Sequence, residues 1–286
     1  MLVRIAAGLC GATLYSLAVF LAPHPIFALG IVVFAVIGTN ELFRAVRRHG
    51  GEPREFLGFA ACVAFGYGAW HGGGAGFAGY LPAVLISLLF AGLVIELVTR
   101  QPHPMINVGS TLLGAVYVGW LFSFVILLHG IQQQIPDMHQ PFLTPIKGTS
   151  VGAWTVWFMT AATWFGDTGA LFTGRILGKH KLAPHVSPGK TWEGSIGGLA
   201  ASLLTGMILG YVLHMEPRHA LAMAAICGIA GQVGDLSESA LKREMGVKDF
   251  DTWIPGHGGV LDRIDSLLFA APLTYYYIVF FVLGQH

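Results

Sequence analysis

The sequence predicts an all-α polytopic integral membrane protein with about nine transmembrane helices and a cytoplasmic N-terminus. Three observations support this fold class. Of the 286 residues, 54% are hydrophobic and only 11% are charged, whereas soluble domains carry about 25% charged residues. Apolar segments close to the roughly 20 residues that a bilayer core requires recur along the chain. The basic residues also concentrate in every second loop, as the positive-inside rule requires.

The composition excludes several classes of protein. A charge deficit spread over the whole chain is atypical of a soluble enzyme or a disordered tail. The formal net charge of +1 supplies no extended basic field for a polyanion, so no nucleic-acid partner is expected and any anion site must be local. The chain therefore belongs to a class whose chemistry takes place in or at a membrane.

The expected spans can be assigned in order. The first follows Arg4 and is interpreted as a retained helix and not as a cleaved signal peptide, because its apolar stretch is longer than a usual signal core. The third is short and rich in glycine. The nine segments are residues 4–22, 26–43, 56–71, 79–99, 107–129, 150–173, 194–214, 219–240 and 264–284.

The distribution of basic residues tests this count. With the N-terminus in the cytoplasm, all of the 16 Lys and Arg residues except Lys147 and Arg218 fall on cytoplasmic segments. An odd number of spans then places the C-terminus outside.

The 286 residues are expected to form a single transmembrane domain. Its N-terminal helices, residues 1–148, serve as a lipid-facing scaffold, and residues 149–286 form the catalytic helices and cytoplasmic loops.

The eighth expected helix gathers polar side chains on one face as it reaches the cytoplasm. Asp235, Glu238, Ser239 and Lys242 are spaced at i, i+3, i+4 and i+7, which places them on the same side of a helix. A carboxylate near a membrane span is energetically costly and usually indicates function. The alternative is a solvated cytoplasmic loop, the ordinary explanation of a charge run.

Two further carboxylates stand at the start of the ninth span. Asp262 and Asp265 are three residues apart and therefore point the same way. Paired carboxylates with no Cys or His at ligand spacing suit a hard, oxygen-seeking cation such as Mg²⁺. The alternative is that these carboxylates form ion pairs with Arg263 or Lys248. A metal site is the favoured interpretation.

A turn rich in glycine and proline connects these two helices. Pro255, His257, Gly258 and Gly259 impose an irregular backbone that can approach a ligand closely. Consecutive N–H groups in such a turn bind anions. His257 is therefore a candidate phosphate or metal-shell contact, although a lone histidine is more often structural.

The loop after the sixth span has a composition typical of phosphate binding. Ser187, Lys190 and Thr191 lie just before the seventh span, where a helix N-terminus adds its positive end. The run is not a P-loop, because position 184, which that pattern requires to be glycine, is Pro184. For the other basic residues of this loop, a topological role alone is an equal alternative.

Residues 239–265 read SALKREMGVKDFDTWIPGHGGVLDRID. This run resembles the signature of the phosphatidate cytidylyltransferase (CDP-diacylglycerol synthase) family, with Ser-x-x-Lys-Arg, Lys-Asp, Pro-x-His-Gly-Gly and Asp-Arg-x-Asp in place. Upstream runs that begin at Asp167, Ser187 and Gly234 also resemble that family, so the resemblance covers about residues 160–266. Asp251 departs from it, since this position is usually small.

The resemblance implies a reaction in which CMP is transferred from CTP to phosphatidic acid, giving CDP-diacylglycerol and pyrophosphate, in bacterial phospholipid biosynthesis. It implies a Mg²⁺-dependent nucleotidyltransferase, with Mn²⁺ as a substitute and room for a second cation. A homodimer among membrane lipids of the bacterial inner membrane, with its active site facing the cytoplasm, is expected on the same ground.

The resemblance also implies roles for individual residues. Asp249 is assigned to substrate binding, with bracing of the loop as its alternative. The metal ligands are expected to be Asp235, Asp262 and Asp265; the phosphate contacts Lys242, Arg243 and Arg263; the catalytic turn His257, Gly258 and Gly259; and the remaining substrate-binding residues Asp167, Ser187, Lys190, Thr191, Ser239 and Lys248.

Two other functions are alternatives to this one, and a third is excluded. A cytidylyltransferase for another lipid phosphate, such as an isoprenoid ether lipid, would use the same head-group site. A carrier would use the acidic residues as its pathway, but carriers bind substrate at mid-bilayer, whereas these charges gather at the cytoplasmic ends of the spans. CDP-alcohol phosphotransferases are excluded because their Asp-Gly-x-x-Ala-Arg pattern is missing from the sequence.

Overall fold

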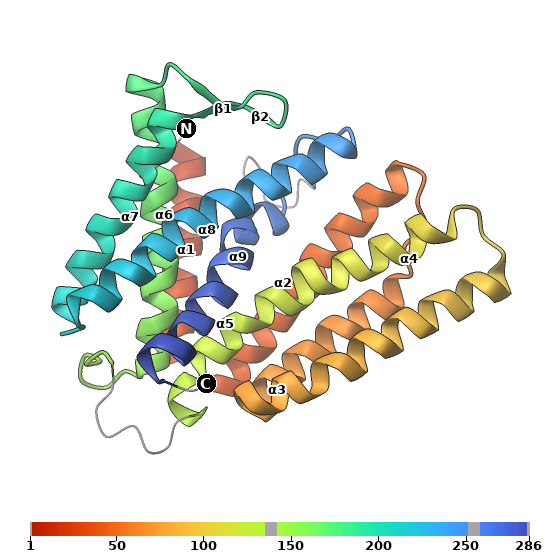
Figure 1. The fold of residues 1–286 in the computed structure, drawn as a ribbon, viewed down its shortest axis with the longest axis horizontal. Coiled ribbons are helices and arrows are strands. Elements are labelled where there is room, and N and C mark those ends of the chain that lie inside the picture. The colour runs from red at the N-terminus through yellow and green to blue at the C-terminus, as the bar shows by residue number, and fades with distance from the viewer. Residues whose placement is uncertain (1, 135–141, 251–257, 285–286) are drawn as a thin grey trace. The chain divides into compact units, whose positions relative to one another are not determined.

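The structure is a computed structural model that describes residues 2–134, 142–250 and 258–284 (Figure 1). The described residues are mostly helical, which confirms the predicted α-helical class. The helices are α1 (Leu2–Leu21), α2 (His24–Arg48), α3 (Glu55–Thr99), α4 (Pro104–Leu113), α5 (Leu121–His129), α6 (Val151–Leu177), α7 (Trp192–Val212), α8 (Pro217–Glu244) and α9 (Leu261–Tyr277). Short helical turns cover Gly114–Trp120, Ile131–Gln134 and Ile278–Val282.

Within the described part of the chain, six helices are long and apolar enough to cross a membrane. They are His24–Arg48, Gly76–Thr99, Pro104–His129, Trp192–Val212, Pro217–Glu244 and Leu261–Val282. The other predicted spans, residues 4–22, 56–71 and 150–173, fall on α1, the first part of α3 and α6. The chain is therefore a multi-pass membrane protein, and the count of nine stays a prediction.

The chain forms two compact units. The first comprises Met1–Gln134 and Glu244–Ile264, and the second comprises Ile135–Arg243 and Asp265–His286. The described residues 245–250 and 258–264 thus belong to the same unit as the N-terminal helices, although they follow α8 in the chain. The assignment of a scaffold role to residues 1–148 and a catalytic role to residues 149–286 stays a prediction.

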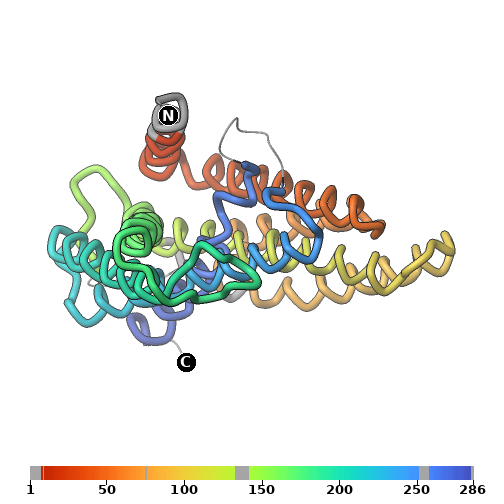
Figure 2. Tube along the Cα trace, turned by 90° about the horizontal axis from the view of Figure 1, so that it is seen from above, coloured from red at the N-terminus to blue at the C-terminus, as the bar shows by residue number. Residues whose placement is uncertain are grey.

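In the first unit, the third and fourth predicted spans are the two parts of α3. Gly73 breaks this helix with φ 54° and ψ −159°, a conformation that only glycine adopts readily. A side chain at Gly72 would lie 3.1 Å from the backbone nitrogen of Phe77, so the two parts approach closely. In both views the second part of α3 and α4 run side by side (Figure 1 and Figure 2).

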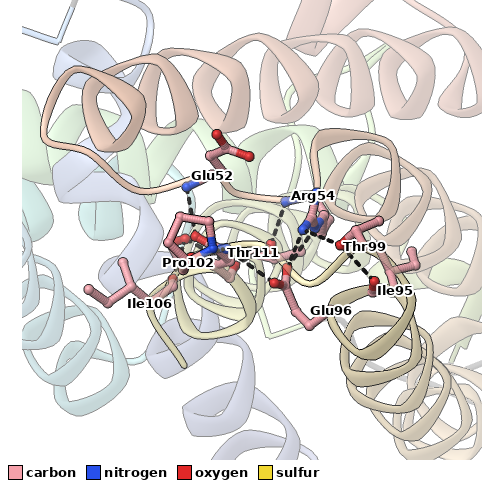
Figure 3. Close-up of polar contacts among 10 residues, drawn as sticks. Glu52, Arg54, Ile95, Glu96, Thr99, Pro102, Ile106 and Thr111 are labelled. Carbon is pink, nitrogen blue, oxygen red and sulfur yellow. Dashed lines mark hydrogen bonds and ion pairs between the residues drawn. The ribbon is translucent and has the colours of Figure 1, made fainter. Parts of the chain in front are cut away.

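A polar network joins three segments of this unit (Figure 3). The Arg54 side chain donates to Glu96 Oε1 through Nε at 2.7 Å, and Asn107 donates to Glu96 Oε2 at 3.2 Å. The backbone N–H of Arg54 also donates to Thr111 Oγ1 at 2.7 Å. Because Glu96 is only 6% exposed, these donors compensate the burial of its charge. The network fastens the loop before α3 to the ends of α3 and α4.

We expect Glu96→Ala to destabilise the protein by about 3 kcal/mol, because removal of one partner leaves the Arg54 guanidinium uncompensated. Thermal unfolding in detergent measures this loss. Thr99→Ala is the matched control: it removes an exposed contact to the same arginine, and surface substitutions usually change stability by about 0.5 kcal/mol or less. Equal midpoints for Glu96→Ala and the wild type would show that the network does not stabilise the fold.

The second unit is built on close contacts between α6, α7 and α8. A side chain at Gly198 of α7 would lie 2.8 Å from the Ala170 side chain and 2.9 Å from the Gly166 carbonyl oxygen of α6. Small residues of this kind let membrane helices approach closely. Gln232 of α8 donates to the backbone oxygen of Ser195 on α7 at 3.1 Å. The three helices are therefore held together by backbone proximity and a part-buried amide.

A β-hairpin, which the sequence pattern did not predict, precedes α7. Strand β1 (Lys181–Ala183) pairs antiparallel with β2 (Ser187–Thr191), with Lys181 opposite Thr191. Glu193 in the first turn of α7 accepts hydrogen bonds from the backbone N–H of Lys179 at 3.1 Å and from His180 Nδ1 at 2.6 Å. These bonds fix the hairpin to the start of α7.

Candidate active site

Three carboxylates of the second unit converge at the junction of α8 and α9. Asp235 and Glu238 come from α8 and Asp265 from α9, and one oxygen of each lies within 4.8 Å of the others. Glu238 is 1% exposed and Asp265 is 8% exposed. We call these three residues the carboxylate cluster. Buried carboxylates at this spacing repel one another and need positive charge close by.

The helices can meet at this point because α8 carries Gly234 beside Asp235. A Cβ atom on Gly234 would lie 2.6 Å from the backbone oxygen of Asp265 and 3.2 Å from the Cα atom of Ser266. Any larger residue would push α9 away from α8. The glycine in the sequence therefore determines how closely Asp265 approaches the acidic face of α8.

Two lysines supply positive charge to the carboxylate cluster. Lys190 of the hairpin places Nζ 2.7 Å from Asp235 Oδ2, and Lys242 places Nζ 2.8 Å from Glu238 Oε2. Lys242 and Glu238 are one helical turn apart, so this pair follows directly from their i, i+4 spacing. Three carboxylates and two ammonium groups leave one net negative charge, which favours a cation at the cluster.

Asp167 and Ser239 lie next to the cluster. Asp167 on α6 lies close enough to Asp235, Asp265 and Lys190 to be affected by their charges. Its Oδ2 atom accepts a long hydrogen bond of 3.5 Å from the Ser266 hydroxyl. The Ser239 hydroxyl donates to Asp235 Oδ1 at 3.4 Å. The structure thus brings both of these predicted substrate-binding residues to the cluster.

The other predicted residues of the hairpin region have local partners. Thr191 Oγ1 accepts the backbone N–H of Gly194 at 3.1 Å and so caps α7. Arg243 Nε donates to the backbone oxygen of Val186 at 3.2 Å, which ties the end of α8 to the hairpin. Ser187 begins β2 and is half-buried. The roles of these residues toward substrate stay predictions.

The remaining predicted residues belong to the first unit. Asp262 Oδ2 accepts the backbone N–H of Gly259 at 2.8 Å and that of Phe250 at 3.3 Å. Gly258 has a φ of 78°, a conformation that favours glycine. Lys248, Asp249 and Arg263 are exposed. His257 and Asp251 lie outside the described residues, so their predicted roles have no structural description.

The carboxylate cluster differs in composition from the predicted set of metal ligands. Asp235 and Asp265 are common to both, and Glu238 joins them, whereas Oδ2 of Asp262 accepts hydrogen bonds from the turn before α9. The sequence did carry a signal for Glu238, which shares a helical face with Asp235. The part that Asp262 plays in metal binding stays a prediction.

Comparison with known proteins identifies relatives of this chain. The profile of the cytidylyltransferase family matches residues 2–281. A phosphatidate cytidylyltransferase of Bacillus subtilis is 35% identical over 201 residues, which cover 70% of this chain and 66% of that protein. One of Brucella suis is 38% identical over 191 residues, covering 66% and 63%. One of Haemophilus influenzae is 45% identical over 142 residues, covering 46% and 48%. The matches span about half to two thirds of these relatives.

Proposed function

Because the chain belongs to the cytidylyltransferase family, we propose that it transfers CMP from CTP to phosphatidic acid, giving CDP-diacylglycerol and pyrophosphate. The observation that supports this proposal most strongly is the carboxylate cluster with its two flanking lysines. Two anionic substrates must meet in this reaction, so their repulsion has to be offset by positive charge at the site. Lysines supply such charge directly, and carboxylates supply it by binding a metal cation. The relatives named phosphatidate cytidylyltransferase supply the choice of substrates.

We propose Mg²⁺ as the cation of the carboxylate cluster, with Mn²⁺ as a substitute and a second cation as a further part of the proposal. The donor set fits, because Asp235, Glu238 and Asp265 offer only oxygen atoms, which Mg²⁺ prefers. Asp262 remains a proposed additional ligand. When bound, Mg²⁺ supplies charge neutralisation and alignment of phosphate oxygens.

The proposed chemistry is a single displacement. A phosphate oxygen of phosphatidic acid forms a bond to the α-phosphorus of CTP, while the bond from that phosphorus to the bridging oxygen of pyrophosphate breaks. The attacking phosphate is already anionic at neutral pH, so no general base is required. Lys190 and Lys242, which flank the cluster, stabilise negative charge on the phosphates, and the leaving pyrophosphate takes the displaced electron pair. Arg243 and Arg263 are proposed to assist them.

We further propose nine membrane crossings with the N-terminus in the cytoplasm, in the inner membrane of a bacterium. The charge pattern supports this orientation, because Lys147 and Arg218 alone of the 16 basic residues fall on outer segments. The lysines and carboxylates of the site then face the cytoplasm, where CTP is available. A homodimer is proposed from the family resemblance.

Two differently labelled samples of CTP test the function. The purified protein is incubated with phosphatidic acid, Mg²⁺ and CTP labelled at either the α- or the γ-phosphate. We expect the α-label to enter the lipid phase and the γ-label to appear in water-soluble pyrophosphate. Lipid labelled from γ-phosphate would contradict CMP transfer, and so would an absence of labelled lipid from either sample.

A competition between two lipid acceptors distinguishes the proposed function from its nearest alternative, a cytidylyltransferase for another lipid phosphate. An isoprenoid ether lipid phosphate is added in increasing amounts to the assay with phosphatidic acid. We expect phosphatidic acid to remain the preferred acceptor at equal concentrations. Preference for the ether lipid would keep the reaction type and overturn the proposed substrate.

A further inference from the structure

Glu41 is a buried acidic residue in α2, within a segment of otherwise mostly apolar residues. Its side chain is 1% exposed. Its Oε1 atom accepts the backbone N–H of Val260 at 2.9 Å, and its Oε2 atom accepts that of Leu261 at 2.8 Å. These residues lie in the same compact unit, although they are 219 and 220 positions apart in the chain.

Both hydrogen bonds reach the start of α9. The first N–H groups of a helix have no partner within the helix, and a negative charge at this end is favourable. Asp262 Oδ2 accepts the N–H of Gly259, the residue before Val260. The N–H groups of three successive residues, from Gly259 to Leu261, are thus taken up by Glu41 and Asp262. These N–H groups are therefore engaged by two of the protein's own carboxylates.

The glycine at position 259 is required by the position of Glu41. A Cβ atom on Gly259 would lie 2.5 Å from Oε2 and 2.8 Å from the carboxyl carbon of Glu41. A buried carboxylate is tolerated only where donors satisfy it, and here the backbone passes close enough to provide them. The Glu41 carboxylate and the turn at Gly258–Leu261 therefore depend on each other: the turn supplies the donors, and Gly259 leaves the space that the carboxylate occupies.

We infer that Glu41 is a positioning residue that fixes the turn at Gly258–Leu261, and through it Asp262 and Arg263, for the transfer of CMP. This inference rests on the proposed function for its effect on catalysis. Glu41 contacts the backbone that carries these side chains and acts through that backbone. Its role differs from that of the Arg54–Glu96 network, which holds helix ends together.

Glu41→Gln tests the inference with Glu96→Gln as a matched control, since both replace a buried carboxylate of the first unit by an amide. The amide introduced at position 41 keeps one acceptor atom in place of two. We expect kcat to fall about 10²-fold, the effect of misplaced reacting groups, while the KM for CTP stays the same. Glu96→Gln should lower the thermal midpoint and leave kcat unchanged below it. Wild-type kcat in folded Glu41→Gln would overturn the inference.

Amide hydrogen exchange provides a readout that does not depend on activity. We expect peptides covering residues 258–262 to exchange at least about tenfold faster in Glu41→Gln than in the wild type, because the N–H groups lose an acceptor. The same peptides should be unaffected in Glu96→Gln. Unchanged exchange would overturn the inference. If the wild type transferred no CMP but exchange still rose, the proposed function would fail and the anchoring of the turn would stand.

A double-mutant cycle adds a test of the contact itself. Gly259→Ala is expected to lower kcat by displacing the Glu41 carboxylate, whereas Glu41→Ala leaves room for the new methyl group. The loss in the double variant should then be smaller than the product of the two single losses, as expected for residues in contact. Losses that multiply would show that the two positions act independently.

Discussion

Asp265→Asn is expected to abolish CMP transfer, with turnover about 10³-fold below that of the wild type, while the protein remains folded in the membrane. The substitution keeps the size of the side chain and removes the negative charge from the carboxylate cluster. Asp265 is 8% exposed, so bulk water has little access to the site and does not take over as a cation ligand. Loss of one preorganised electrostatic contact to a reaction centre costs about 10²- to 10³-fold, and a proposed cation ligand belongs at the upper end of that range.

Glu216→Gln is the matched control for this prediction. Glu216 precedes the start of α8, where it pairs with Arg218 at 2.8 Å with its own side chain 53% exposed. Its turnover should equal that of the wild type. Turnover measured with α-labelled CTP, divided by the amount of folded protein from size-exclusion chromatography, makes the comparison. Wild-type turnover by Asp265→Asn would remove this residue from the site.

Removal of divalent cations is also expected to cause a large loss of CMP transfer. Chelation with EDTA should reduce CMP transfer at least about 10³-fold, because uncompensated carboxylates would repel the phosphates of both substrates. Excess Mg²⁺ should restore it. Asp235→Asn weakens the cluster and should therefore raise the Mg²⁺ concentration that gives half-maximal activity.

The control for chelation is EDTA already saturated with Mg²⁺, which should not inhibit. Activity is measured with the α-labelled CTP assay over a series of Mg²⁺ concentrations. Full activity in EDTA, or the same Mg²⁺ requirement in Asp235→Asn and the wild type, would contradict the assignment of a cation to the carboxylate cluster.

Much of the helical architecture follows from local sequence, because long apolar stretches between polar loops define the helices. The break in α3 was also predicted, because the third expected span ends at residue 71 and the fourth begins at residue 79, on either side of Gly73. Residues 71–76 contain no Asp, Glu, Lys or Arg, so the sequence did not predict that the chain reverses there without a polar loop. The hairpin of β1 and β2 was missed because its strands are short and are held in place by Glu193, a residue outside both strands.

The candidate site was predictable where its residues share one element. Helical spacing brings Asp235, Glu238 and Lys242 together on α8. Spacing alone could not separate Asp262 from Asp265, since both fit one helical face, yet an acidic residue in the first turn of a helix commonly accepts backbone N–H groups, as Asp262 does.

Contacts between distant parts of the chain were beyond reach from one sequence. Glu41 stands out as an acidic residue in an apolar segment, but its partners at Val260 and Leu261 lie in another part of the chain. No local pattern connects a carboxylate with backbone groups so far along the sequence, because neither side-chain spacing nor composition records backbone hydrogen bonds.

Direct measurement of cation binding tests the central claim, that the carboxylate cluster holds a divalent ion. Mn²⁺ is titrated into the purified protein and followed by its electron paramagnetic resonance signal, which falls as the ion binds. We expect the wild type and Glu216→Gln to bind Mn²⁺ with equal affinity, Mg²⁺ to displace it, and Asp235→Asn and Asp265→Asn to bind it at least about tenfold more weakly. Equal binding by all four proteins, or no binding by the wild type, would contradict the claim.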